Sequence, residues 1–317
     1  MSQATNPPII TTDLPVVATD DPVVVTGANG FVGSHVVRRL AESGHAVRAM
    51  VRRPAAYTPP AGVEVVQADL TRPESLGDAL HGAGALVHAA AITANYKQPY
   101  PDAYRQINEI GTANLVAQAS EAGIKRVVLV SGLGTRPAAA GTYMATRWGM
   151  EEAVRGSGIP FVIVQPSVQF GGDAEFVCAL ARIADVSPVV PAMTGAHTRF
   201  QPIWIEDVVT AVEMSLTDDR LLGREIAIGG SEYATFRQIV ELILEVSGKK
   251  RLIAPLPVGL AKIQAALLGF LPRPPLTAAT LELFGFDNTT ELDSVKKNFG
   301  FEPRGFSEYL RANGLHG

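Results

Sequence analysis

The sequence has one cysteine, no excess of positive charge and no long uninterrupted apolar run. Cys178 is the single cysteine among 317 residues, which excludes an internal disulfide. The sequence also contains no CxxC motif and no Cys/His cluster of the kind that holds zinc. A reducing compartment fits this usage. Because no His or Arg is adjacent to Cys178, we expect a small buried side chain there rather than a reactive thiol.

The charge balance excludes another class of function. Lys and Arg total 27 against 31 for Asp and Glu, a formal net charge of -4. Such a chain has no general basic field that would collect nucleic acid or anionic lipid. We therefore expect no nucleic-acid partner.

Targeting and membrane-spanning signals are also missing. Residues 1–20 contain no Lys or Arg and no apolar core of signal-peptide length, so we expect a loose arm and a cytoplasmic location. The longest apolar stretch, residues 256–271, includes Lys262 and Gln264 and is short for a membrane span. It predicts an amphipathic helix packed on a neighbouring surface, with a position on a membrane interface as the alternative.

From Pro22 onward the sequence alternates short β-branched runs with longer helical patterns. This alternation is typical of βαβ units and of a parallel sheet that is buried on both faces. It predicts strands at residues 23–26, 46–51, 63–67, 85–89, 127–130 and 161–164. It predicts helices at residues 31–43, 72–80, 104–122 and 144–157. The predicted fold class is α/β, a doubly wound Rossmann sheet.

The alternation breaks down after Pro166, where glycine pairs and prolines become frequent. We expect a smaller substrate-side lobe at residues 168–202 and 231–317. The nucleotide-binding domain is predicted at residues 21–167, and a strand-helix-strand pattern predicts that residues 203–230 return to it.

A glycine-rich turn lies between the first predicted strand and the first predicted helix. Gly27 permits a tight turn, Gly30 lets the backbone approach a pyrophosphate, and Gly33 lets the helix lie close to the sheet. The helix N-terminus attracts the phosphate charge. Because the strand and the helix are both present, the turn indicates dinucleotide binding rather than a purely structural turn. Further candidate cofactor contacts in this turn are Asn29, Phe31 and Val32.

The end of the second predicted strand decides between NAD and NADP. An acidic residue there bonds a free ribose 2′-hydroxyl and repels a 2′-phosphate. This strand ends in Arg52 and Arg53, whose guanidinium groups hold phosphate through fixed forks of donors. NADP(H) is therefore predicted over NAD(H), with a solvated basic loop end as the alternative. Asp69 and Leu70 follow the third strand, where a short side chain can cap the adenine edge.

The chain beyond residue 21 resembles the short-chain dehydrogenase/reductase superfamily in its extended and atypical branches, which are NAD-dependent epimerase/dehydratase-like. It is particularly similar to the group of the NDUFA9-type subunit of respiratory complex I. Besides the glycine turn and residues 48–54, the resemblance is carried by residues 69–70, 87–91, 108–115, 130–131, Tyr143 with residues 151–152, and residues 166–167. It implies that the cofactor is also lined by Ala89, Ala90, Ala91, Tyr143, Arg147, Pro166 and Ser167.

In that family, a Tyr and a Lys four residues later share one helix face, and a Ser or Thr follows the fifth strand. Tyr143 matches the Tyr and Ser131 matches the hydroxyl, whereas Arg147 stands where the family has Lys. The resemblance implies hydride exchange between a nicotinamide and a carbonyl or alcohol carbon. The Tyr moves a proton, and the neighbouring cation lowers its pKa from about 10. Arginine keeps the charge but cannot lose a proton.

Several other polar residues have ordinary structural explanations. We expect His35 and His88 to be packed or hydrogen-bonded rather than metal ligands. Asn108 is expected to bond backbone within its own helix. Glu206 and Asp207 are expected to place negative charge at the start of a helix.

Two functions stay open. The first is an NADP(H)-dependent oxidoreductase, epimerase or dehydratase that acts on a small hydroxyl- or carbonyl-bearing substrate, which Tyr143 and Ser131 favour. The second is a redox-silent NADP(H)-binding accessory subunit or sensor that docks on a partner such as a membrane complex. Arg147 and the apolar residues 256–271 favour the second. Whether the chain forms an oligomer is open under both.

Overall fold

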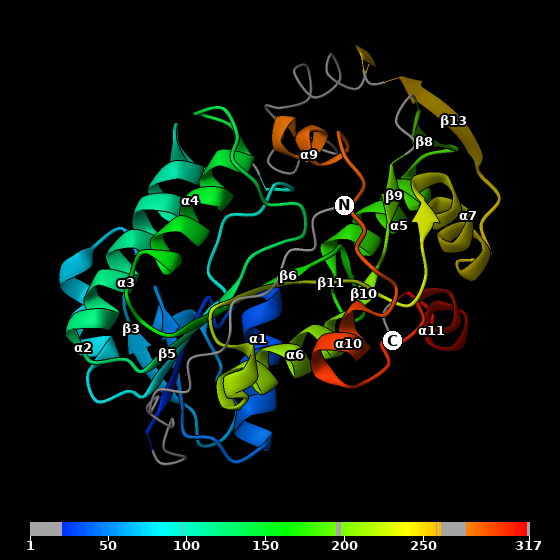
Figure 1. Cartoon of the computed structure of the whole chain (residues 1–317). Coiled ribbons are helices and arrows are strands. Elements are labelled where there is room, and N and C mark those ends of the chain that lie inside the picture. Colours follow the sequence, from blue (N-terminus) through cyan, green and yellow to red (C-terminus); the bar gives the residue numbers. More distant parts are fainter. Residues whose placement is uncertain (1–20, 97, 195–197, 258, 261–276, 316–317) are drawn as a thin grey trace, which may run out of the picture.

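The computed structural model describes residues 21–96, 98–194, 198–257, 259–260 and 277–315. Its centre is a seven-stranded sheet with the strand order β11-β6-β5-β4-β1-β2-β3, and all neighbouring strands are parallel (Figure 1). The strands are β1 Val23–Thr26, β2 Val47–Val51, β3 Glu64–Gln67, β4 Ala85–His88, β5 Arg126–Val130, β6 Phe161–Pro166 and β11 Arg224–Ile228. The predicted Rossmann fold is confirmed.

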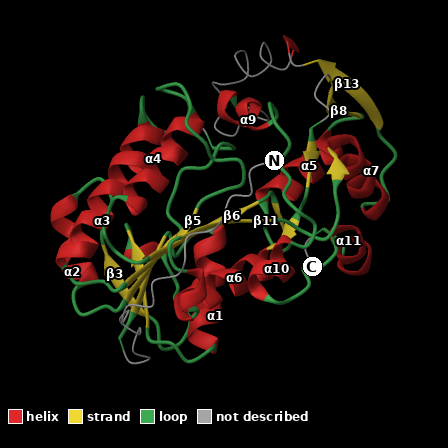
Figure 2. Cartoon of the chain, viewed as in Figure 1, coloured by secondary structure: helices red, strands yellow, loops and turns green. Residues whose placement is uncertain are grey.

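Helices cover both faces of this sheet, as Figures 1 and 2 show. One face carries α2 Leu76–Leu80, α3 Gly111–Glu121 and α4 Tyr143–Arg155, and the other carries α1 Phe31–Glu42 and α6 Ile205–Thr217. Along β1, Val24 packs in one apolar cluster with Leu115 and Met150, whereas Val25 packs in the other with Val36 and Val208. Strands β1 and β4, at the centre of the sheet, are buried at every position and almost wholly apolar because both faces are covered.

Most of the chain beyond β6 lies beside the carboxyl ends of the central strands (Figure 1). It builds a third apolar cluster. Phe170, for example, packs edge-on against Phe306 with ring centres 5.0 Å apart. Cys178 is buried on α5, as expected, and burial raises the pKa of its thiol. The described α-helices and strands beyond β6, apart from α6 and β11, are β7 Gln169–Phe170, α5 Glu175–Val186, β8 Val189–Thr194, β9 Arg199–Phe200, β10 Ile203–Trp204, β12 Ala234–Thr235, α7 Phe236–Val246, β13 Leu252–Pro257, α9 Ala278–Leu283, α10 Ser294–Phe299 and α11 Phe306–Asn313. Of these, α10 packs instead in the cluster of Val25.

Within residues 203–230, β11 is a strand of the central sheet and α6 lies on one face of it. Strand β11 pairs with β6, with Ile226 opposite Val164, and helix α6 packs beside α1. The division of the chain into two lobes stays a prediction.

Two predicted helices differ from the structure. Residues 105–110 form a wider π-helical turn, η3 Arg105–Ile110, before α3 begins. Leu256 and Pro257, expected to start an amphipathic helix, instead end β13, whose prolines are tolerated in a two-stranded edge pair with β8. Residues 1–20 and 261–276 lie outside the described residues. Among the described residues, no helix is long and apolar enough to cross a membrane.

Candidate functional site

The candidate site lies at the edge of the sheet where the parallel strands end. The glycine turn follows β1, residues 89–91 follow β4, Ser131 follows β5 and Ser167 follows β6. Strand order reverses between β1 and β4, and a crevice at such a switch point is where open α/β sheets bind ligands. The structure therefore brings these candidate segments to one edge.

The three glycines of the turn have different surroundings. A β-carbon on Gly33 would lie 2.1 Å from the Gly27 carbonyl oxygen, and one on Gly27 would lie 2.8 Å from the Ala89 oxygen. Gly27 also has φ of +67°. Gly30 is exposed, with φ of -87° and ψ of 173°, and a β-carbon there would be 3.1 Å from Gly27 O. Thus Gly27 and Gly33 serve the fold, whereas Gly30 leaves backbone open to the outside.

The other residues of the turn lie at its tip and at the start of α1. Asn29 is exposed, whereas Phe31 and Val32 are half-buried. No side chain caps the N-terminus of α1, so its backbone N–H groups are available to an anion.

A buried chain of hydrogen bonds links the end of β1, just before the glycine turn, to β4 and α3. Thr26 Oγ1 lies 2.7 Å from His88 Nδ1, and His88 Nε2 lies 2.8 Å from Thr112 Oγ1. Since Thr112 donates its own proton to the Asn108 carbonyl, the His88 proton sits on Nε2 and Nδ1 accepts from Thr26. Burial lowers the pKa of His88 to about 4. The expected structural role of His88 is confirmed.

Asn108 holds the segment that follows β4. Its side chain is fully buried; Oδ1 accepts from the Ile92 N–H at 2.8 Å and Nδ2 donates to the Ile92 carbonyl at 3.0 Å. The expectation that Asn108 bonds backbone within its own helix is wrong. The π-helical turn η3 carries the side chain, which pairs with backbone beyond its own helix.

Two arginines without a side-chain partner among the described residues follow directly after β2. Arg52 and Arg53 are exposed, and neither donates a side-chain hydrogen bond or forms an ion pair within the described residues. Arg48, on the same strand, instead pairs with Glu64 at 2.8 Å. Asp69 accepts from the backbone and hydroxyl of Thr71, so its carboxylate is partly committed to its own turn. Leu70 is buried against Gly111.

Tyr143 and Arg147 lie one turn apart at the start of α4. Their exposed fractions are 7% and 8%, and the guanidinium carbon of Arg147 lies 5.9 Å from the centre of the Tyr143 ring. The Arg147 guanidinium packs closely against the segment after β5. A β-carbon on Gly132 would lie 2.1 Å from Nη2 of Arg147.

Nη2 of Arg147 is buried and has no hydrogen-bond partner among the described residues. Nε of Arg39 and of Arg126 share this state, but each of those arginines bonds through another nitrogen. The Arg147 side chain forms no hydrogen bond or ion pair with any described residue. A buried donor without a hydrogen-bond partner costs free energy of folding. A ligand bound at the carboxyl edge of the sheet would supply the partner that Arg147 lacks.

Helix α9 closes over Tyr143. The Tyr143 ring packs with Ala279 of α9 and edge-on against Tyr104, with ring centres 5.1 Å apart. Glu282 of α9 accepts from the backbone N–H of Tyr143 and Met144 at 3.3 and 3.2 Å. This contact joins α9 to the N-terminus of α4.

The pKa of Tyr143 departs from the expectation. Burial raises it, while Arg147 and the Ala94 backbone lower it and Glu282 raises it. The net shift is upward, so the expected lowering by the neighbouring cation is outweighed by desolvation. The phenol therefore keeps its proton at neutral pH.

Ser131 and Ser167 have donors that are committed to the protein. Ser131 Oγ donates to Glu151 Oε1 at 2.6 Å. Ser167 donates its hydroxyl to Gln201 O and its N–H to Ile228 O, while Pro166 beside it is buried in β6. A cofactor contact from Ser167 would thus use neither donor.

The interface between α1 and α6 uses the remaining polar candidates. His35 Nδ1 lies 2.6 Å from Glu206 Oε1, so the expected hydrogen-bonded role of His35 is confirmed. Glu206 and Asp207 occupy the first turn of α6, as expected, although no side chain caps it. Asp207 accepts from the Arg304 N–H, and burial raises its pKa to about 6. No cluster of metal-ligating side chains occurs among the described residues.

Sequence reasoning missed Glu151 and Glu282 as site residues. Glu151 carried a signal, since it follows Tyr143 and Arg147 at the same four-residue step along α4. Glu282 carried no such signal, because its contact with α4 spans 139 residues of sequence.

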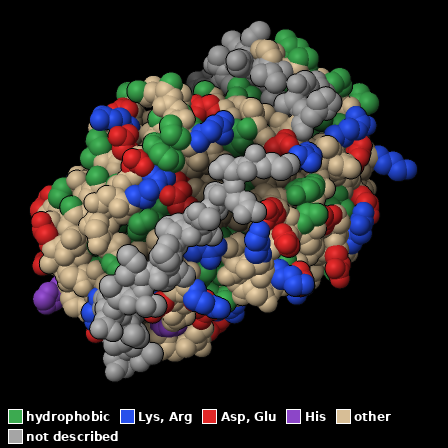
Figure 3. Space-filling view, in the orientation of Figure 1, with side chains coloured by type: hydrophobic (Ala, Val, Ile, Leu, Met, Phe, Trp, Pro, Cys, Tyr) green, Lys and Arg blue, Asp and Glu red, His purple; other side chains and the backbone are tan. Residues whose placement is uncertain are grey.

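The surface charges are mixed. On the face seen in Figure 3, Lys and Arg side chains are intermingled with Asp and Glu.

Known proteins share sequence with this site. A family model described as NAD(P)H-binding matches residues 27–176, from the glycine turn to α5. Ceramide reductase of Caulobacter vibrioides is 34% identical over 58% of this chain and 57% of its own length. Sterol demethylase protein B of Methylococcus capsulatus is 30% identical over 72% of this chain and 75% of its own length. The matched family model supports a nicotinamide cofactor as a ligand of this chain.

Two further matches cover most of the chain. Subunit 9 of the mitochondrial NADH dehydrogenase [ubiquinone] 1 alpha subcomplex from Arabidopsis thaliana is 25% identical over 84% of this chain and 68% of its own length. The structure of triphenylmethane reductase from Citrobacter sp. has a TM-score of 0.73 at 23% identity and covers 93% of this chain and 99% of its own. The second match concerns the fold alone.

Proposed function

We propose, from the premise that this chain belongs to the extended branch of the short-chain dehydrogenase/reductase superfamily, that it is an NADP(H)-dependent oxidoreductase acting on a small carbonyl or hydroxyl compound. The observation that carries the proposal is the unpaired Nη2 of Arg147. The guanidinium group of Arg147 is thus free to donate beside the protonated Tyr143, at the edge where the nicotinamide cofactor would bind.

The residues present fit such a cofactor. The open backbone at Gly30 and the free N-terminus of α1 suit a pyrophosphate. The unpaired guanidinium groups of Arg52 and Arg53 suit a ribose 2′-phosphate, which favours NADP(H) over NAD(H). Arg147 would donate to the nicotinamide ribose. The bound nicotinamide would supply or accept the hydride.

Tyr143 is proposed to handle the proton. Its raised pKa keeps the phenol protonated, so in the reducing direction it can give the proton to the carbonyl oxygen as the carbonyl carbon takes the hydride. Arg147 then stabilises the tyrosinate by charge. Because arginine cannot release a proton, the route by which Tyr143 regains its proton cannot pass through Arg147.

The test is oxidation of NADPH by purified protein with a panel of ketones and aldehydes, followed by nicotinamide absorbance. Tyr143→Phe should remove turnover of any accepted substrate, by about 10²–10⁴, while NADPH affinity is retained. Arg147→Lys should raise turnover, because lysine can pass a proton onward. Turnover that is unaffected by Tyr143→Phe would contradict the role of the tyrosine.

The second candidate is a redox-silent NADP(H)-binding subunit. Arg147 in place of Lys favours it, and so does the likeness to a subunit of a mitochondrial NADH dehydrogenase. Tight NADPH binding without oxidation in the wild type and in Arg147→Lys would select this candidate. Docking on a membrane complex, with a cytoplasmic or peripheral location, belongs to this proposal.

The proposed division of labour follows the sheet. Residues 21–167 with 203–230 would bind the cofactor, and residues 168–202 with 231–317 would face the substrate. Helix α9, which covers Tyr143, is the described part of the second lobe that contacts the proposed catalytic side chain.

A further inference from the structure

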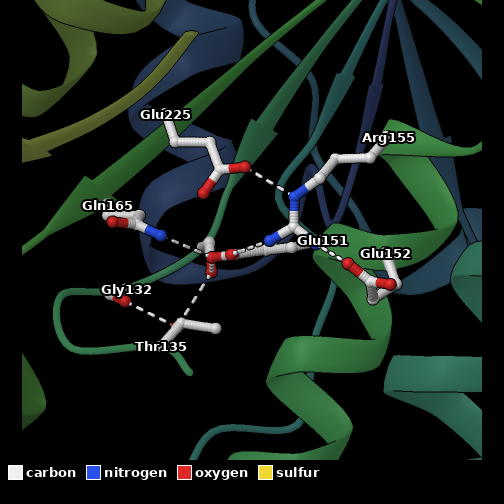
Figure 4. Close-up of polar contacts among 8 residues, drawn as sticks. Gly132, Thr135, Glu151, Glu152, Arg155, Gln165 and Glu225 are labelled. Carbon is white, nitrogen blue, oxygen red and sulfur yellow. Dashed lines mark hydrogen bonds and ion pairs between the residues drawn. The ribbon is translucent and has the colours of Figure 1, made fainter. Parts of the chain in front are cut away.

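A fully buried carboxylate lies directly behind Ser131. The Glu151 side chain has no exposed surface and contacts three donors (Figure 4). Oε1 accepts from Ser131 Oγ at 2.6 Å and from Gln165 Nε2 at 2.8 Å. Oε2 accepts from Arg155 Nη2 at 2.9 Å. The donors come from the ends of β5 and β6 and from the last turn of α4.

The positive charge beside Glu151 is shared. Arg155 also binds Glu152, one residue on, and Glu225 of β11, the latter through Nε at 2.5 Å (Figure 4). One guanidinium thus serves three carboxyl groups, which together carry an excess of two negative charges when all are ionised. Protonation of Glu151, the buried carboxylate, reduces this excess to one negative charge. Burial raises the pKa of Glu151 and Glu225 raises it further. The hydrogen bonds from Ser131 and Gln165 and the charge of Arg155 lower it, and the net shift is upward.

The protons around Ser131 can be counted. Thr135 donates its proton to the Gly132 carbonyl at 2.7 Å, so at 3.3 Å from Ser131 Oγ it can only accept. An ionised Glu151 has no proton and takes the single proton of Ser131. A protonated Glu151 can instead donate to Ser131 Oγ, which frees the serine proton for another acceptor.

We propose that Glu151 is a positioning residue whose proton decides whether Ser131 can donate a hydrogen bond to the oxygen of a carbonyl substrate. The proposal rests on the proposed oxidoreductase function, and it gives Ser131 two states. Below the pKa of Glu151 the hydroxyl is available to the substrate. As the pH rises through that pKa, the hydroxyl turns back to the carboxylate and the donor is lost.

The substitution Glu151→Gln should hold Ser131 in the state in which its hydroxyl can donate to the substrate. In Glu151→Gln the amide oxygen must face Arg155, which only donates, so the amide NH₂ faces Ser131 and donates to it. Gln165 can rotate its own amide to accept. Ser131 is then a donor to substrate at every pH. Glu152→Gln is the matched control, because Glu152 binds the same Arg155 and is exposed, whereas the described hydrogen bonds of Ser131 go to Glu151 and Thr135 and not to Glu152.

The first measurement is an infrared pH titration of the full-length protein without substrate. Asp207, whose pKa is also raised, contributes its own carbonyl-stretch band, so the measurement is the difference between each variant and the wild type. We expect Glu151→Gln to lack one protonated-carboxyl band that the wild type and Glu152→Gln share and lose as the pH rises. If Glu151→Gln and the wild type have identical bands at every pH, or if the band that distinguishes them is lost at the ordinary pKa of a glutamic acid, the proposal is overturned. This readout needs no turnover, so it stands apart from the proposed function.

The second measurement is the pH profile of NADPH oxidation. Wild type and Glu152→Gln should lose rate by about tenfold per pH unit above the pKa seen in the infrared titration, whereas Glu151→Gln should be flat across that range and Ser131→Ala slow throughout. A Glu151→Gln profile that keeps the wild-type slope overturns the proposal. If no variant oxidises NADPH with any carbonyl compound, the proposed function fails, and the infrared titration alone decides whether Glu151 holds the proton.

Discussion

The two halves of helix α4 treat the same residue type in opposite ways. Arg147, in the first half, is buried with an unpaired nitrogen and no polar partner among the described residues. Arg155, two turns later, binds three carboxylates and stacks 4.1 Å from the centre of the Trp148 ring. A protein tolerates an unsatisfied buried donor where a ligand completes it, and satisfies its donors internally where they hold the fold.

The same contrast separates the cofactor edge from the layer beneath it. At the edge, Gly30, Arg52 and Arg53 leave backbone or guanidinium groups open. Beneath it, His88 and Asn108 have their side-chain hydrogen bonds made within the chain. The comparison predicts that changes at the edge alter cofactor binding, whereas changes beneath it alter stability.

The largest expected difference is within the glycine turn. Gly33→Ala should cost more than about 4 kcal/mol of stability, because its β-carbon would meet the backbone of Gly27 at 2.1 Å. Gly30→Val, despite its larger side chain, should stay folded and lose NADPH binding. Thermal melts with cofactor titrations check both. A Gly30→Val protein that still binds NADPH as the wild type does would place the pyrophosphate elsewhere.

The two arginines of α4 provide the next test. Arg155→Met should cost about 3 kcal/mol, since it strips the buried Glu151 of its charged partner. Arg147→Met should change the stability of the apo protein by less than about 1 kcal/mol, because it removes an unsatisfied donor, but it should weaken NADPH binding. Urea unfolding and cofactor titration of both variants measure this. Equal destabilisation would show that Arg147 is structural.

The layer beneath the turn has a pH signature. His88 has its pKa lowered from 6.5 to about 4, so the unfolded chain takes up this proton first as the pH falls. The contribution of His88 to stability is complete above pH 6.5 and is lost between pH 6.5 and 4, by roughly 3 kcal/mol. Asp207, with its raised pKa, changes stability in the opposite sense, so the measurement is the wild-type curve minus that of His88→Gln. A difference that does not vary with pH would argue against the buried neutral histidine.

The smallest expected effect concerns cofactor choice. Arg52→Asp should weaken NADPH binding by about 1.5–3 kcal/mol, the range of a hydrogen bond to a charged group, and affect NADH less. Arg48→Gln is the matched control, because Arg48 lies on the same strand but is paired with Glu64. Affinities come from fluorescence titration of both cofactors. Equal losses for NADPH and NADH in Arg52→Asp would remove the case for the 2′-phosphate.

Much of the nucleotide-binding half could be predicted from the sequence. The glycine turn, six central strands and the helix at residues 31–43 were placed to within a few residues, because each depends on local periodicity or on a backbone conformation that only glycine adopts readily. The helix expected at residues 104–122 begins instead with the π-helical turn η3. Nothing local in the sequence marks that wider turn, and its Asn108 side chain bonds the backbone of Ile92, 16 residues earlier.

The sequence by itself determined the parallel sheet, the phosphate turn and the spacing of Tyr143 and Arg147 on one helix face, since period and residue type are properties of neighbours along the chain. The tertiary structure alone decided that Glu282 meets α4, that Ser131 donates to Glu151 and that the pKa of Tyr143 rises despite the adjacent arginine. Each of these depends on burial and on contacts between segments distant in sequence. Desolvation and pairing energies arise only when such segments exclude water together.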